Sequence, residues 1–244
     1  MKFHSLACLI MIGVATLLPA HRAAAGEPRA VVELFTSQGC SSCPKADRLL
    51  GELSRDPSLV TLSLPVDYWD YLGWKDTLAL HGHTARERAY AAVRGDRAVY
   101  TPQAVIDGKV AVVGNDRQAI EDAIAKSPQT TLHVPVSLRV EDGKIVASLD
   151  ASGDASTAEV WLCPTIARAV VKVMRGENSG HELTYTNVVR RWVKLGDYTG
   201  KAQTFTASLD DVSGDGADGF TVLVQRGAAS KPGPVIGAAQ TAAR

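Results

Sequence analysis

The chain has few cysteines and no second close cysteine pair. Of its 244 residues, four are cysteines: Cys8, Cys40, Cys43 and Cys163. A structural zinc site needs four ligands, usually supplied by two close pairs, so the sequence gives no support for such a site. Pro44, not His, follows Cys43, which excludes the motif for covalent haem attachment.

The chain also lacks an excess of charge of either sign. Lysine and arginine together number 26, and aspartate and glutamate together also number 26. There is therefore no basic surplus that would predict binding to nucleic acid or to an anionic membrane surface. Methionine is scarce, at three residues, and no methionine-rich segment suggests a dedicated copper carrier.

Long apolar runs are absent beyond the N-terminus. Residues 6–18 form an apolar run behind a basic start, and the small residues 23–25 follow it. The run is short for a membrane span, so this pattern predicts a cleaved signal peptide over residues 1–25. We expect a soluble mature protein that begins at Gly26 in an oxidising compartment, either periplasmic or secreted.

The most informative stretch is a strand that leads into a helix opening on two cysteines. Val31 to Phe35 is apolar except for Glu33, as in a strand that is buried on both faces. From Cys43 onward, apolar residues recur at the spacing of one helix face, and Pro44 falls in the first turn, where proline is tolerated. Those apolar residues are Ala46, Leu49, Leu50 and Leu53.

This placement predicts different chemistry for the two thiols. Cys40 lies at the helix N-terminus, where unpaired N–H groups favour a thiolate, so we expect it to be the more acidic and more exposed thiol. Cys43 lies one turn further in and suits a resolving thiol. A disulfide between them would close a short loop and constrain the unfolded chain little. The pair is therefore interpreted as a redox or metal-binding site in preference to a structural bridge.

Further elements follow along the first half of the chain. We predict a strand over residues 59–64, a helix opened by a capping box at Thr84 and ending near Gly95, a hairpin turning at Asp107-Gly108, and a helix that ends near residue 126. The aromatic segment 68–74 either roofs the core, which is the commoner use, or borders a substrate groove.

The order of these elements resembles the thioredoxin fold. The resemblance rests on Cys40-Ser41-Ser42-Cys43 at the first strand–helix junction and on Thr101-Pro102 about sixty residues later. It implies that Pro102 is cis and lies against the cysteines. It also implies that Thr101 and Pro102 present backbone to a bound peptide or mixed disulfide, with Tyr100, Ser41 and Ser42 as further substrate contacts.

Glu33 has two interpretations. It is similar in place to the buried acid of thioredoxin that exchanges protons with the resolving thiol, although it lies seven residues before Cys40 and that acid lies six before. A buried glutamate would have a raised pKa and could act as a general base near neutral pH. Equally, Glu33 could be a strand-edge carboxylate paired with a lysine or arginine.

A closer resemblance is to the secreted bacterial proteins grouped as domain-of-unknown-function family 1223. It rests on segments 35–44, 66–70 and 100–103, and it extends through most of the mature chain, including segments 175–178 and 187–190. It implies a thioredoxin-like fold and no particular substrate.

From about Leu132 the sequence becomes rich in strands. Alternating strands flank Asp142-Gly143, and further strand candidates are residues 158–163, 169–174, 203–208 and 220–225, with a short edge strand after Lys231. Cys163 falls in an apolar strand and is interpreted as a buried small hydrophobe. We therefore predict a thioredoxin-like α/β domain over residues 26–130, followed by an all-β, sandwich-like domain over residues 131–244.

Two functional classes remain after these exclusions. The favoured hypothesis is an exported enzyme, a thiol–disulfide oxidoreductase in which Cys40 attacks, Cys43 resolves and Pro102 shapes the site. Its cofactor would be the Cys40–Cys43 disulfide itself, with no metal, and its partners would be protein or small-molecule thiols and disulfides. The alternative is a periplasmic binding or protein-interaction module without catalytic turnover, in which the thiol pair holds a soft metal such as Cu(I) and the β-rich domain is a docking surface.

Overall fold

The computed structural model describes residues 27–128, 130–154 and 157–241. Within these ranges the chain forms a mixed α/β fold dominated by sheet, with four α-helices and twelve strands. The signal peptide predicted over residues 1–25 lies outside the described residues. No helix in the described ranges has both the length and the apolar character needed to cross a bilayer.

The first half of the chain alternates strands and helices in the predicted order. Its elements are β1 (Ala30–Thr36), α1 (Cys43–Leu53), β2 (Leu59–Pro65), the 3-10 helix η1 (Asp70–Leu72), α2 (His81–Arg94), β3 (Gln103–Ile106), β4 (Val110–Val113) and α3 (Arg117–Lys126). The second half is almost entirely strand, as predicted. Its elements are β5 (Val136–Glu141), β6 (Lys144–Leu149), β7 (Ala158–Lys172), β8 (Glu182–Val189), β9 (Val193–Tyr198), β10 (Gln203–Ser208), α4 (Leu209–Val212), β11 (Gly219–Ala228) and β12 (Lys231–Gln240).

One large sheet runs through both halves of the chain. Among the described residues it has nine strands in the order β12-β11-β7-β8-β2-β1-β3-β4, with β9 also paired to β7. Strand β1 is parallel to β2 and antiparallel to β3. Strands β2 and β8 meet at Ser63 and Val188 and so join the two halves. The large sheet therefore contains strands from both sides of the boundary predicted near residue 130.

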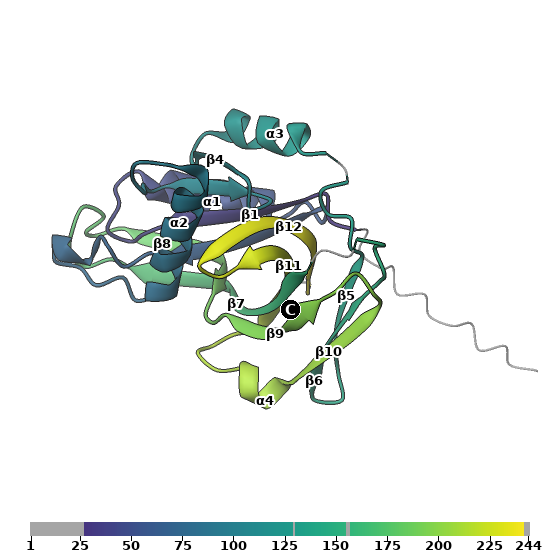
Figure 1. The fold of residues 1–244 in the computed structure, drawn as a ribbon. Coiled ribbons are helices and arrows are strands. Elements are labelled where there is room, and N and C mark those ends of the chain that lie inside the picture. Colours follow the sequence, from purple (N-terminus) through teal and green to yellow (C-terminus); the bar gives the residue numbers. More distant parts are fainter. Residues whose placement is uncertain (1–26, 129, 155–156, 242–244) are drawn as a thin grey trace, which may run out of the picture.

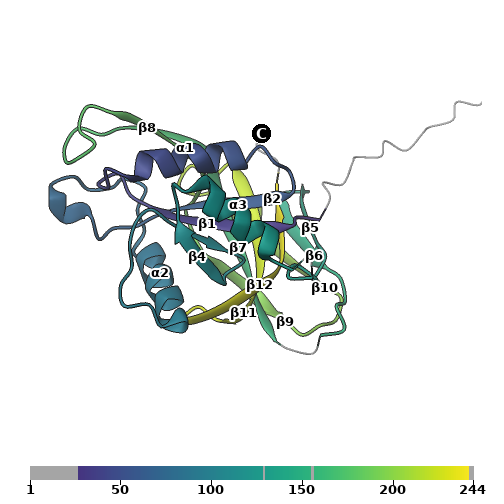
Figure 2. The same ribbon diagram turned by 90° about the horizontal axis from the view of Figure 1, so that it is seen from above.

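Helices cover both faces of this sheet around β1 (Figures 1 and 2). Val32 and Leu34 pack with α1 and α3 on one face, whereas Val31 and Phe35 pack with Tyr90 of α2 on the other. Successive side chains of a strand point to opposite faces, so burial on both faces accounts for the nearly continuous apolar run in β1.

A smaller sheet packs on the C-terminal part of the large one. It consists of the antiparallel strands β10, β6 and β5. Residues of β6 share an apolar cluster with residues of β7 and β11, among them Ile145, Ala147, Val160, Leu162, Val222 and Val224. This part of the protein has the two packed antiparallel layers of a sandwich, but one layer belongs to the sheet that also carries β1.

Strand β7 corrects the prediction of two separate strands over residues 158–163 and 169–174. It runs for fifteen residues through Pro164, which interrupts a strand pattern because proline has no N–H to donate. Pro164 lies where β7 changes partner from β9 to β8, and its carbonyl accepts the Arg190 N–H at 2.9 Å. Strands β8 and β9 were not predicted, and β12 is ten residues long, not short.

Helix α2 begins three residues before the predicted capping box. Leu80 is its N-cap residue and supplies no side-chain cap. Thr84 lies inside the helix, and its hydroxyl donates to Asp67 Oδ1 at 2.5 Å. The capping-box prediction at Thr84 is therefore wrong, because a tertiary contact with the loop after β2 uses that hydroxyl.

Candidate functional site

The cysteine pair forms a disulfide where β1 passes into α1. Cys43 is the first residue of α1, and its Cα lies 5.4 Å from that of Cys40. Cys40 is 2% exposed and Cys43 is 0% exposed, whereas Ser41 and Ser42 between them face solvent. Cys40 is thus the more exposed of the two cysteines, as predicted, but the difference in exposed fraction is small. A partner molecule reaches the sulfurs only if neighbouring side chains move aside.

The segment before β3 lies against Cys40. The peptide bond between Thr101 and Pro102 is cis, as the resemblance to thioredoxin implied, and Pro102 is buried. The carbonyl oxygen of Thr101 lies 3.7 Å from Cys40 Sγ. Tyr100 is 40% exposed at the start of the same segment. The fold thus brings the predicted Thr101-Pro102 segment to the cysteine pair.

Trp69 contacts both sides of this junction. Its Nε1 donates to Thr101 Oγ1 at 2.7 Å, and a Cβ added at Gly39 would lie only 2.9 Å from its own Cβ. Trp69 packs on the core and also stacks on Tyr71, with ring centroids 6.4 Å apart. Tyr71 is 77% exposed. The aromatic segment therefore roofs the core, the commoner of its two predicted uses, and also contacts Thr101 beside the cysteines. A substrate groove along this segment stays a prediction.

The connection between β7 and β8 closes the other side of the cysteine loop. Asn178 is buried, and its Nδ2 donates to the carbonyl oxygens of Gln38 and Cys40, each at 2.9 Å. The Ser41 N–H donates to Glu177 Oε2 at 3.1 Å. The carboxylate of Glu177 thus lies near the N-terminus of α1, where the positive end of the helix dipole would also stabilise a Cys40 thiolate.

Sequence reasoning did not predict a role for Glu177 or Asn178. Their only signal was their membership of segment 175–178, which was noted for the family resemblance without a function. Each contacts a cysteine-loop residue more than 130 positions earlier in the chain, so no local pattern connects them.

Glu177→Gln is expected to increase the thiolate fraction of Cys40 in the reduced protein. The amide can still accept the Ser41 N–H, but it no longer places a second negative charge beside the sulfur. Because a charge at a helix end is worth ~0.3–1 kcal/mol, the alkylation rate of Cys40 at pH 7 should rise roughly two- to fivefold. The reduction potential should become more positive, since a stabilised thiolate favours the reduced form.

The measurement is iodoacetamide alkylation against pH, combined with a redox titration. Glu182→Gln, an exposed glutamate at the start of β8, is the matched control and should change neither quantity. A slower alkylation in Glu177→Gln would contradict the assignment.

Glu33 does not serve the cysteine pair in this structure. It lies on the face of β1 that α2 covers, opposite the face covered by α1. Its side chain is fully buried, with Oε1 accepting Arg86 Nε at 2.7 Å and Oε2 accepting the Tyr90 hydroxyl at 2.6 Å. The predicted proton exchange with Cys43 is therefore not supported. The alternative ion pair is found, although it is buried and not at a strand edge.

Two other acids lie behind the cysteine loop, and sequence reasoning missed both. Asp47 follows Cys43 by four residues in α1, Asp76 precedes α2, and each is 3% exposed. Asp76 accepts the Gln38 N–H at 2.7 Å, and burial raises its pKa to about 6. Burial also raises the pKa of Asp47 well above its ordinary value, against a hydrogen bond from Thr36. The sequence signal for Asp47 was its position on the apolar face of the predicted helix, which would have indicated a buried carboxyl.

Other candidate features lie away from this site. Cys163 is a buried free thiol in β7, as predicted, and burial raises its pKa. In the part of the chain that the structure describes, no group of three or more His, Cys, Asp and Glu side chains is arranged to hold a metal ion.

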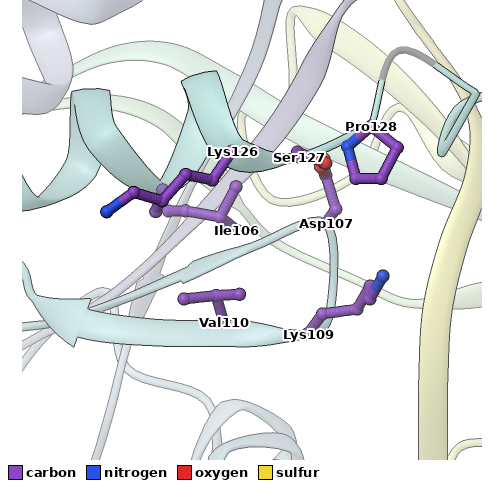
Figure 3. A pocket seen from close by; sticks show the side chains of 8 residues that line it. Ile106, Asp107, Lys109, Val110, Lys126, Ser127 and Pro128 are labelled. Carbon is purple, nitrogen blue, oxygen red and sulfur yellow. The ribbon is translucent and has the colours of Figure 1, made fainter.

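A small cavity lies between the end of α3 and the β3–β4 hairpin (Figure 3). It has a volume of about 130 Å³ and is lined by Ile106, Asp107, Lys109, Val110, Ala123, Lys126, Ser127 and Pro128. The Asp107 carboxylate is already engaged, since it accepts the Val31 N–H at 2.7 Å and the Ser127 hydroxyl at 2.5 Å. The ammonium groups of Lys109 and Lys126 lie at opposite ends (Figure 3), so the polar groups do not converge on one ligand.

A family model and a solved structure both match most of this chain. A family model described as a protein of unknown function, DUF1223, matches residues 31–225. An Agrobacterium tumefaciens protein, whose crystal structure was solved as a structural genomics target, shares 32% sequence identity with this chain. The match covers 89% of this chain and 96% of that protein's chain, with a TM-score of 0.80. A search of curated proteins gave no match. The matched range includes the cysteine pair, the cis-proline segment and the β7–β8 connection, and the chain belongs to the DUF1223 family of proteins of unknown function.

Proposed function

We propose that this protein is a thiol–disulfide oxidoreductase with a thioredoxin-like arrangement around Cys40 and Cys43. Three strand pairings support the arrangement: β1 with β2 in parallel, and β1 with β3 and β3 with β4 antiparallel. Helices α1 and α3 on one face and α2 on the other complete it. In this proposal residues 26–130 are the thioredoxin-like part, and residues 131–244 extend its sheet and supply the β7–β8 connection.

One observation carries the proposal. The Cys40–Cys43 disulfide lies at the start of α1, and the Thr101 carbonyl of the cis-proline segment lies 3.7 Å from Cys40 Sγ. A disulfide whose sulfurs are separated by only two residues adds little to stability. Its position beside a backbone segment that is able to receive a partner favours exchange chemistry.

In the reduced protein, Cys40 is the attacking sulfur. The helix N-terminus favours its thiolate, and Ser42 Oγ, which lies 3.4 Å from Cys40 Sγ, is able to donate a hydrogen bond to it. The thiolate attacks one sulfur of a partner disulfide, the partner S–S bond breaks, and one partner thiolate leaves. A mixed disulfide between Cys40 and the partner remains.

Cys43 completes the exchange. Its thiol loses a proton and attacks Cys40 Sγ, so that the Cys40–Cys43 bond forms and the second partner thiolate leaves. The protein has then lost two electrons and the partner has gained two. The reverse sequence oxidises a partner dithiol, and the relative stability of the Cys40 thiolate sets the direction.

The partner would bind along the rim of the site. Ser41 and Ser42 lie between the two cysteines and are exposed, Tyr100 is 40% exposed at the start of the next segment, and Thr101-Pro102 would offer backbone to an extended peptide. We propose protein or small-molecule thiols and disulfides as substrates. We further propose an exported, periplasmic or secreted location, which rests on the sequence of residues 1–25 and fits a compartment in which disulfides persist.

A redox titration of the purified mature protein tests this proposal. We expect one reversible two-electron transition, at a potential between about −270 and −120 mV, the range from thioredoxin to the strong periplasmic oxidants. The transition should persist in Cys163→Ala, because that thiol is buried in β7. A disulfide that stays closed at more negative potentials would instead be a structural bridge and would refute the proposal.

A further inference from the structure

Two buried aspartates and a buried tyrosine from three elements lie near one another behind the cysteine loop. Asp47 belongs to α1, Asp76 to the segment before α2 and Tyr185 to β8, and they are 3%, 3% and 0% exposed. Both aspartates act electrostatically on the tyrosine, and Asp76 also acts on Asp47. Asp47 Oδ2 and the Tyr185 hydroxyl find no hydrogen-bond partner among the described residues. Unpaired buried polar atoms cost stability, which points to a functional role for the cluster.

Asp47 lies one helical turn beyond Cys43. Side chains four residues apart on a helix have Cβ atoms ~5–6 Å apart, and both residues are on the buried face of α1. The Thr36 hydroxyl donates to Asp47 Oδ1 at 2.8 Å and so holds the carboxyl between α1 and the end of β1. The second oxygen, Oδ2, is buried and has no hydrogen-bond partner among the described residues.

The surroundings of Asp47 favour its protonated form. Burial raises its pKa and the nearby Asp76 adds to the effect, whereas the Thr36 hydrogen bond and the Arg48 charge act in the opposite direction. Tyr185 of β8 interacts electrostatically with both aspartates and stays neutral, because burial raises its pKa. The raised pKa makes Asp47 a better match for proton exchange with a thiol near neutral pH than an exposed aspartate would be.

On the basis of the proposed exchange reaction, we propose that Asp47 is the proton donor and acceptor of Cys43. When a partner thiolate attacks Cys40 Sγ, the Cys40–Cys43 bond breaks, its electron pair goes to Cys43, and Asp47 gives that sulfur a proton. In the reverse direction, the Asp47 carboxylate takes the proton from Cys43 as Cys43 attacks Cys40 and the partner leaves as a thiolate. Each direction moves one proton and needs no further reactant.

The test separates the two steps in the reaction of the reduced protein with an aromatic disulfide reagent that releases a coloured thiolate. Attack by Cys40 releases the first coloured thiolate, and closure by Cys43 releases the second. Asp47→Asn is expected to slow the second release at pH 7 by at least about tenfold, while the first stays within about twofold. Asp122→Asn, a half-exposed aspartate of α3, is the matched control and should change neither step.

A second variant keeps the proposal testable even if Asp47→Asn does not fold. Thr36→Val removes the hydrogen bond that favours the carboxylate, so the pH profile of the second release should move to higher pH. A wild-type protein that releases only the first thiolate would refute the exchange function itself. A wild-type protein that releases both, with an unchanged second step in Asp47→Asn and an unmoved profile in Thr36→Val, would overturn the role of Asp47 alone.

Discussion

Cys43→Ser is expected to accumulate covalent adducts with partner thiols, about one per protein molecule, whereas Cys40→Ser should accumulate few. Without Cys43, nothing is left to release the mixed disulfide that Cys40 forms. Without Cys40, the remaining sulfur belongs to a fully buried residue at the first position of α1, where a partner disulfide does not reach it. Both variants should lose turnover entirely, because the overall exchange needs two sulfurs.

The measurement is a pull-down of mixed disulfides from a periplasmic extract, with release by dithiothreitol. The double variant Cys40→Ser/Cys43→Ser gives the background, including any adduct of Cys163. Alkylation rate against pH in each single-cysteine variant gives an independent readout. If Cys43 alkylates faster than Cys40 near neutral pH, or if Cys43→Ser captures nothing, the two sulfurs do not have the assigned roles.

Features that depend on neighbouring residues were predictable from the sequence. The Asp-Gly pairs at 107–108 and 142–143 both turn hairpins, and all four residues have positive φ, from 49° to 70°. Few residue types tolerate two consecutive positive φ values, so this pair is a specific signal. The start of α1 at the cysteines follows in the same way from helical spacing and from the tolerance for Pro44 in the first turn.

The second half of the site was not predictable in this way. Asn178 and Glu177 reach the cysteine loop only because β8 lies beside β2 and packs near α1, and that pairing joins Ser63 to Val188. Two residues that meet across a sheet can be separated by any number of positions in the sequence, so no periodic pattern predicts their contact. Dividing the chain near residue 130 also hid this contact, because it placed the two partners in separate domains.

Asp47 was missed for a different reason. Its position four residues after Cys43 was visible in the sequence, and helical spacing places both on one face. Only apolar residues were counted toward that face, however, so a carboxyl among them was not recognised as buried. For Glu33 the sequence left two interpretations open, and the structure has the ion pair with Arg86, in the interior and not at a strand edge.

Glu33→Gln is expected to lower the free energy of unfolding by about 3–5 kcal/mol. Arg86 is only 8% exposed, and its Nε donates to Glu33 Oε1 at 2.7 Å. Its guanidinium also lies 4.3 Å from the centroid of the Trp192 ring and 4.9 Å from that of Tyr90. The amide would keep the shape of the site but leave a buried cation without a counter-charge, which is the costly way to break a buried pair.

Urea unfolding followed by tryptophan fluorescence gives this loss directly. The control is Asp56→Asn, because the Arg29–Asp56 pair is 53% and 40% exposed and an exposed pair is worth about 0–1 kcal/mol. Replacing both partners, in Glu33→Gln/Arg86→Met, should recover much of the loss, since no buried charge is then left. A loss in Glu33→Gln no larger than that in Asp56→Asn would contradict the structural role.

The same variant separates the two interpretations of Glu33. If Glu33 only holds Arg86 and Tyr90, folded Glu33→Gln protein should keep the wild-type pH profile for disulfide closure by Cys43. If Glu33 instead exchanged protons with Cys43, that profile would move while Asp47→Asn left it in place. Because stability and proton transfer are measured in separate experiments on one protein, a loss of stability cannot be mistaken for a loss of catalysis.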